Sequence, residues 1–140
     1  MDWMKIDQIA KRSGLTKRTI RFYEEIGLLS SPKRTEGGVR LYSEDDLGEL
    51  ERVISAKEVL GFSLQELQQF MEMSKHLEMN KEGYLLSLDK VERKEKLEDI
   101  QNMLNEQLRM IDEKIEKFQS FKKRLKGMQH KARHALSHID

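Results

Sequence analysis

The 140-residue chain contains no cysteine, a single proline and no hydrophobic run long enough to span a membrane. The absence of cysteine excludes disulfides, thiolate metal sites and cysteine-held clusters. Without a membrane span or a segment like a signal peptide, the sequence predicts a cytoplasmic protein. It also lacks a glycine-rich phosphate loop, a nucleophile elbow and a paired acidic motif. We therefore expect that the protein is not an enzyme and needs no cofactor.

The charge is distributed unevenly along the chain. Residues 1–42 contain nine Lys or Arg and five Asp or Glu, whereas the remaining 98 residues contain 17 Lys or Arg and 20 Asp or Glu. Between Lys11 and Arg21 there are five cations and no acid. Such a basic segment releases counterions when it binds phosphates, so the N-terminal part of the chain is predicted to bind a nucleic acid.

Two short helices joined by a tight turn are predicted near the N-terminus. Apolar residues at i, i+3 and i+4 from Ile6 give the first helix one buried face, and Gly14 ends it. Thr16 is expected to cap the second helix. That helix carries its cations on a face away from Ile20, and these cations are Lys17, Arg18 and Arg21. This pairing is typical of a helix-turn-helix whose second helix reads DNA.

A hairpin is predicted for residues 33–42, with its turn at Gly37-Gly38. Alternation along the second strand directs Arg40 and Tyr42 to one side and apolar residues, including Val39, to the other. A hairpin with one polar side suits a wing that lies along the phosphate backbone.

Capping boxes at Ser43 and Ser63 predict two further helices. Arg52 and Lys57 on the first of these are candidates for phosphate contacts. Exposed helices carry such residues routinely, so we favour a solvated surface for both.

From residue 90 onward there is no proline and one glycine, Gly127, and every seventh residue from Leu97 to Ile139 is apolar. The second apolar position of each heptad moves between d and e around Gln107 and Lys114. The pattern predicts a coiled coil and therefore a second copy as partner. The alternative is a monomer whose helix folds back at Gly127. The candidate dimer contacts are Leu97, Ile100, Leu104, Leu108, Ile111, Ile115, Phe118, Phe121 and Leu125.

The first half of the chain resembles the N-terminal domain of the MerR family of bacterial transcription regulators. The matching runs are Ile9-Ala10, Ser13-Gly14, Thr19 to Leu28, Gly38 to Tyr42 and Leu60 to Leu64. Two positions depart from the family pattern: Val39 stands where Tyr is frequent, and Glu58 stands where a basic residue is frequent.

The resemblance implies a mainly α fold, with an N-terminal winged helix-turn-helix and a long helix that pairs antiparallel with its copy. It also implies a homodimer that binds and distorts a near-palindromic promoter so that RNA polymerase can engage it. The expected parts are a DNA-binding domain (1–72), a connector that forms a short helix (73–95) and a dimerisation helix (96–140). The expected DNA-binding residues are Thr16, Lys17, Arg18, Thr19, Arg21, Phe22, Tyr23, Arg40 and Tyr42.

Some alternatives stay open at this point. The apolar segment 84–88 packs against the dimerisation helix or against the DNA-binding domain of the second copy, or it lines an effector pocket, and we favour packing. His130, His134 and His138 share a helix face and could ligate zinc, nickel or copper. They lie on the outer side of the coil, so we favour solvated side chains and assign no metal. An excisionase-like architectural protein and a coiled-coil adaptor for a protein partner are the competing functions.

Overall fold

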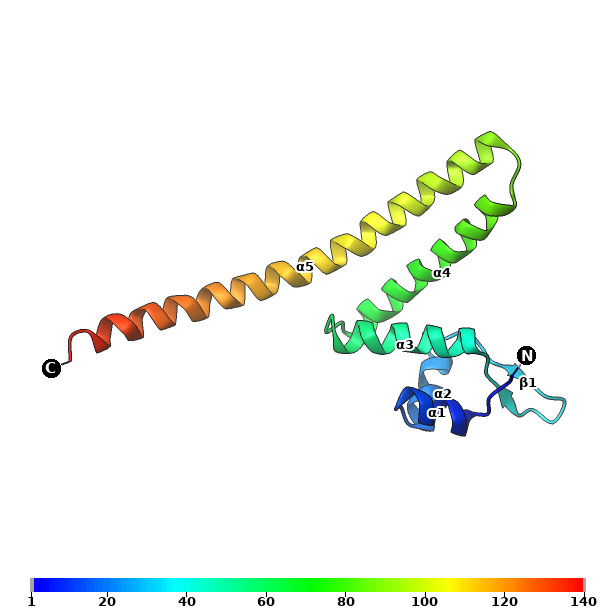
Figure 1. The fold of residues 1–140 in the computed structure, drawn as a ribbon, viewed down its shortest axis with the longest axis horizontal. Helices are drawn as coiled ribbons and strands as arrows, with labels where there is room; N and C mark the ends of the chain where they lie inside the picture. Colours follow the sequence, from blue (N-terminus) through cyan, green and yellow to red (C-terminus); the bar gives the residue numbers. More distant parts are fainter. Residues whose placement is uncertain (1, 140) are drawn as a thin grey trace.

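The computed structural model describes residues 2–139, and Figure 1 shows their arrangement. In chain order the elements are α1 (Ile6–Ser13), α2 (Lys17–Glu25), β1 (Lys33–Arg34), β2 (Arg40–Leu41), α3 (Glu44–Glu58), α4 (Leu64–Leu86) and α5 (Lys90–Leu136). The first five elements form a head, α4 and α5 form a long hairpin, and the end of α5 extends alone (Figure 1). The predicted fold, a helix-turn-helix with a two-stranded hairpin and a long C-terminal helix, is confirmed. No helix in the described range is long and apolar enough to cross a membrane.

Local signals begin and end the helices of the head where the sequence predicted them. The side chain of Thr16 accepts a hydrogen bond from the backbone N–H of Thr19 at 3.1 Å and so caps α2. Capping boxes at Ser43 and Ser63 begin α3 and α4. Gly27 has a φ of 77°, a conformation that glycine adopts without strain, and the chain reverses there to pass under α3.

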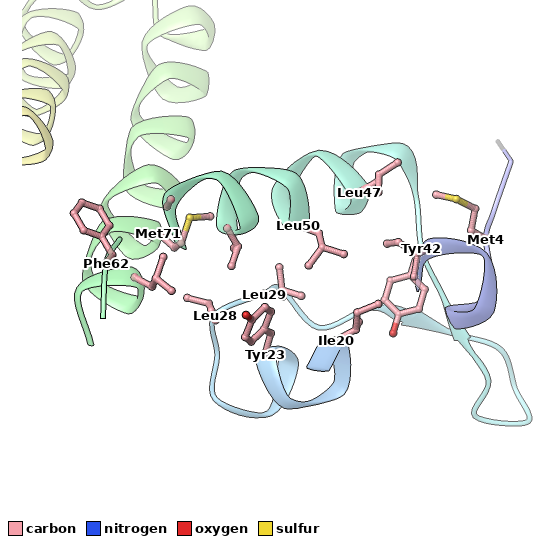
Figure 2. Packing of buried hydrophobic residues seen from close by; sticks show 14 of the residues in the cluster. Met4, Ile20, Tyr23, Leu28, Leu29, Tyr42, Leu47, Leu50, Phe62 and Met71 are labelled. Atoms are coloured by element: carbon pink, nitrogen blue, oxygen red, sulfur yellow. The ribbon is translucent and has the colours of Figure 1, made fainter. Parts of the chain in front are cut away.

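The core lies between α2, α3 and the segment that follows α2. Figure 2 shows Ile20, Tyr23, Leu28 and Leu50 pointing into this space, and Ile20 and Leu50 are fully buried. At the other end of the core, Met4 and Tyr42 exchange two backbone hydrogen bonds of 2.8 Å. The chain start is thereby joined to the end of the hairpin, and the wing is attached to the core from that side.

The helices α4 and α5 run antiparallel and are joined by polar contacts as well as apolar ones. Gln107 is buried, and its side-chain amide donates hydrogen bonds to the Phe70 carbonyl at 3.2 Å and to the Ser74 hydroxyl at 2.8 Å. Nearer the head, the Lys114 ammonium pairs with the Glu66 carboxylate at 3.1 Å. These contacts set the register of the hairpin.

The structure extends α4 further than the sequence suggested. Residues 73–86, which the sequence assigned to a connector with a short helix, continue α4 without a break, and α5 begins at Lys90. Partly buried residues of this segment recur every three or four positions, at Met73, Leu77, Asn80 and Tyr84. A single helix face therefore packs along α5, which is why the segment stays helical.

Two different faces of α5 carry apolar residues. One stripe, which includes Ile100, Met103, Gln107 and Met110, is buried or half-buried within the chain. The heptad stripe at Leu97, Leu104, Leu108 and Ile115 is 45–56% exposed. Ile111 lies between the two stripes and packs against the core of the head.

Beyond Lys114 every described residue of α5 is exposed. The helix continues without a break through Gly127 to Leu136, so the alternative of a helix that folds back at Gly127 is wrong. No residue in the range 2–139 covers the apolar side chains of this half, which include Phe118, Phe121 and Leu125. Their surface is open to solvent in the single chain.

Candidate nucleic-acid interface

The predicted reading helix α2 presents its cations to solvent. Lys17, Arg18 and Arg21 are exposed, whereas Ile20 and Tyr23 on the opposite face are at most 4% exposed. Within residues 2–139, Arg18 and Arg21 form no ion pair with an acidic side chain. Their guanidinium groups are thus available to phosphates and base edges.

Lys17 is held differently from the two arginines. Its ammonium lies 2.6 Å from a carboxylate oxygen of Asp7 in α1, and this hydrogen bond and charge lower the pKa of Asp7 below its usual value. Both side chains are largely exposed, so the pair contributes little to stability. It links the first helix to the start of the second, and a phosphate could replace Asp7 as the partner of Lys17.

The hydroxyls of Thr16 and Thr19 lie 2.9 Å apart at the start of α2. The Thr16 hydroxyl oxygen also accepts a hydrogen bond from the backbone N–H of Thr19, so both side chains stabilise the first turn of α2. Phe22, one turn further on, is 43% exposed beside Tyr23.

A buried carboxylate joins α2 to the wing, the hairpin of residues 33–42. Glu24 projects from the last turn of α2, and its side chain is only 8% exposed. The Tyr42 hydroxyl donates to one of its oxygens at 2.5 Å, and the Arg40 Nε donates to the other at 3.0 Å. Burial, followed by the hydrogen bond to Glu24, raises the pKa of the Tyr42 hydroxyl. This acid was not among the predicted site residues, because no spacing in the sequence connects it to residues 40 and 42.

The structure corrects the predicted roles of Tyr23 and Tyr42. Both belong to the buried core, at 4% and 3% exposure, so their rings are closed to DNA in this conformation. Val39, expected on the apolar inner side of the hairpin, is 47% exposed. The reason is that the strands are only two residues long, and alternation inside them does not extend to residues 39 and 42.

The wing adds two cations that were not among the predicted site residues. Lys33 and Arg34 form β1, both are exposed, and Arg34 donates to the Gly38 carbonyl at 3.1 Å across the hairpin turn. A surface hollow between α2 and the wing is lined by Arg21, Arg34 and Arg40 together with Glu24 and Glu25. Arg21 thus connects the cations of α2 to those of the wing in one basic surface.

His130 and His134 lie near the end of α5, His138 follows the end of this helix, and all three are exposed. The rings of His134 and His138 have centroids 4.5 Å apart, and Nδ1 of His138 lies 2.9 Å from the His134 carbonyl oxygen. In the part of the chain that the structure describes, no three potential metal ligands come together.

Comparisons with known proteins agree with this geometry. Residues 4–74 match the family described as MerR HTH family regulatory protein. The chain is 75% identical over 140 residues to the HTH-type transcriptional regulator YfmP of Bacillus subtilis (strain 168), with 100% of both sequences covered. It is 37% identical over 113 residues to the HTH-type transcriptional regulator CueR of Escherichia coli O157:H7, covering 78% of this chain and 82% of CueR.

Solved structures share the fold over nearly the whole chain. A MerR family transcriptional regulator from Bacillus thuringiensis gives a TM-score of 0.54 at 25% identity and covers 95% of this chain and 99% of its own. HiNmlR, a MerR family regulator that lacks the sensor domain and is bound to promoter DNA, gives a TM-score of 0.58 at 20% identity. The alignment covers 98% of this chain and 95% of HiNmlR, and at this identity the likeness concerns the fold.

Proposed function

The chain belongs to the MerR family of helix-turn-helix regulatory proteins, and we propose that it binds a near-palindromic promoter operator as a homodimer and distorts the DNA between the half-sites. It is a transcription regulator and not an enzyme. In this proposal residues 1–72 bind DNA and residues 96–140 carry the dimer contacts. In this proposal the protein acts in the cytoplasm, where RNA polymerase engages the distorted promoter.

The observation that carries the proposal is the continuous basic surface of α2 and the wing. Arg18 and Arg21 pair with no acid among residues 2–139, and arginine is the side chain that most often recognises guanine in the major groove. Lys33 and Arg34 stand on the wing, where contacts with phosphates orient a protein on the duplex. HiNmlR, which shares the fold, is bound to promoter DNA, and this supports the same kind of partner here.

The exposed stripe of α5 supports the homodimer. Leucine and isoleucine side chains recur along it at heptad spacing, and a long apolar stripe on a lone helix is unfavourable in water. A second copy offers the same stripe, and two heads at a fixed separation are suited to two half-sites. The DNA between the half-sites is then read through the free energy needed to deform it.

The direct test is footprinting and gel-shift titration on the DNA upstream of the protein's own gene. Arg18→Ala and Arg21→Ala should each weaken specific binding by about 1–3 kcal/mol, which is roughly 5-fold to 150-fold. Lys81→Ala, which removes an exposed cation of α4, is the matched control and should bind normally. Wild-type affinity should also fall steeply with salt.

Unchanged footprints in both arginine variants, or an affinity that is insensitive to salt, would contradict DNA reading by α2. If DNA binding failed while the chain captured a protein partner through α5, the adaptor function would replace this proposal.

A further inference from the structure

The segment before α1, residues 2–5, runs along the wing. Met4 exchanges two backbone hydrogen bonds of 2.8 Å with Tyr42, so the segment lies beside the end of the hairpin as an additional antiparallel strand. Figure 2 shows the Met4 and Tyr42 side chains next to each other at this end of the core. Met4 is buried, whereas its neighbours Trp3 and Lys5 are exposed. The buried Met4 thus fixes the position from which these two side chains reach the surface.

Lys5 extends the basic surface of α2 and the wing. A second surface hollow, between the start of α1, α2 and the wing, is lined by Lys5, Asp7, Arg21 and Arg40 among others. The hollow between α2 and the wing also contains Arg21 and Arg40, so the two hollows adjoin. Asp7 already pairs with Lys17, and Lys5 forms no ion pair within residues 2–139. The basic surface therefore continues from the wing to the start of α1.

Trp3, two residues before Lys5, lies against the wing. The Lys33 ammonium is 5.4 Å from the centroid of the indole ring, and 38% of Trp3 is exposed. Lys33 is exposed as well, and it pairs with no acid in the described range. A cation near the face of a tryptophan ring is attracted to it. The two side chains thus present an apolar ring with a positive charge beside it.

The chemistry of these three side chains, Trp3, Lys5 and Lys33, matches the backbone of DNA. Each nucleotide offers an anionic phosphate next to an apolar deoxyribose. The two lysines can neutralise phosphates, and the indole ring can pack on a sugar while its N–H donates to a phosphate oxygen. A protein partner would need acids to match the two lysines. DNA meets that need, and it is also the partner proposed for the adjoining basic surface.

We propose that Trp3 and Lys5 bind the DNA backbone beside the wing, so that the segment before α1 is a third part of the DNA interface. This inference rests on the DNA-binding function proposed above. Contacts with sugars and phosphates carry no sequence information, but they fix the orientation of a protein on the duplex. Trp3 and Lys33 together then hold the wing against the backbone, and this sets the angle at which α2 meets the base edges.

The fluorescence of Trp3 tests the contact in the unaltered full-length protein, because this is the only tryptophan in the chain. The protein is titrated with the duplex that footprinting identifies. Gel shift and acrylamide quenching of the emission are measured on the same samples. Quenching should fall on binding, because DNA covers the ring. The control is the double variant Trp3→Phe with Tyr84→Trp, which moves the fluorophore to the last turn of α4, where quenching should not change.

Substitutions test the energetic contribution of the contact. Trp3→Ala should weaken binding by about fivefold or more, equally on operator and on random duplex, since a backbone contact does not depend on sequence. Trp3→Phe keeps a ring and should recover most of the loss. Lys5→Ala should reduce the slope of log affinity against log salt by about 1. Lys81→Ala is the control and should change neither quantity. If urea unfolding shows that Trp3→Ala disrupts the head, the quenching of the unaltered protein decides the question.

The outcomes separate this inference from the function on which it rests. If no duplex gives a gel shift, DNA binding itself fails. A normal gel shift with unchanged quenching of Trp3 would refute the contact, and so would wild-type affinity in Trp3→Ala. If Trp3→Ala lost affinity for the operator but not for random duplex, Trp3 would read bases, and the assignment to the backbone would be overturned.

Discussion

Removing the Glu24 carboxylate should loosen the wing and destabilise the head. The group is buried, and it accepts hydrogen bonds from the Tyr42 hydroxyl and the Arg40 guanidinium. A hydrogen bond to a charged group contributes about 1.5–3 kcal/mol, and a buried hydroxyl left without a partner costs about 1–3 kcal/mol. Arg40 is partly exposed, so its share is discounted. We expect Glu24→Ala to lower the free energy of unfolding by about 2–4 kcal/mol.

A double-mutant cycle separates the tyrosine from the arginine. Tyr42→Phe removes the donor but leaves Glu24 paired with Arg40, and it should cost about 1–2 kcal/mol. The double variant should then be more stable than the sum of the two single effects predicts, since both remove the same bond. Urea unfolding at one fixed protein concentration measures all four free energies, because a dimer's stability depends on concentration.

The pH dependence of the same cycle gives an independent readout. The pKa of Tyr42 is raised in the folded protein, so above its ordinary value of 10.0 the unfolded chain loses this proton first. Wild-type stability should therefore hold below pH 10 and fall above it, by up to about 1.4 kcal/mol per pH unit relative to Tyr42→Phe. The reasoning is refuted if Glu24→Ala costs less than about 0.5 kcal/mol, or if wild type and Tyr42→Phe keep a constant difference from pH 8 to pH 11.

Two further changes address the α4–α5 hairpin. Gln107→Ala removes a buried amide that donates to Ser74 and to a carbonyl of α4, and it should lower unfolding stability by about 1–3 kcal/mol, whereas exposed Gln101→Ala should be neutral in the same urea assay. The pKa of Glu66 is lowered first by a backbone N–H at the start of α4 and then by Lys114, so its contribution is present above pH 4.5 and is lost as the pH falls. Glu66→Gln should accordingly lose less stability than wild type between pH 6 and pH 3, and equal acid profiles would contradict this account.

The parts of the fold that depend on neighbours in sequence could be predicted. Thr16, Ser43 and Ser63 begin helices because a hydroxyl and an N–H three residues apart meet in any helix start. The cation face of α2 was equally accessible, since helical spacing alone separates Arg18 and Arg21 from Ile20.

The parts that depend on tertiary contacts could not be predicted. Tyr42 follows a two-residue strand, and its inward direction results from pairing with Met4, 38 positions earlier in the chain. Once Tyr42 is buried, its hydroxyl requires an acceptor, and Glu24 supplies it from another element. No periodicity connects residues 4, 24 and 42, so the wing's attachment was visible only in the structure.

The drift of the heptad pattern in α5 has its explanation in the two faces of the helix. Gln107 and Lys114 are polar at heptad positions that would normally be apolar, and both are used inside the chain, in hydrogen bonds and an ion pair with α4. That face is thus occupied wherever α4 lies beside α5, and the exposed apolar stripe is rotated to Leu104 and Leu108. Beyond Lys114 no α4 residue competes, and the stripe returns to the usual positions at Phe118 and Phe121. In the proposed homodimer, α5 packs on α4 within the chain and on the second copy outside it, so its apolar stripe must change position where α4 ends, and the sequence shows this change near Lys114.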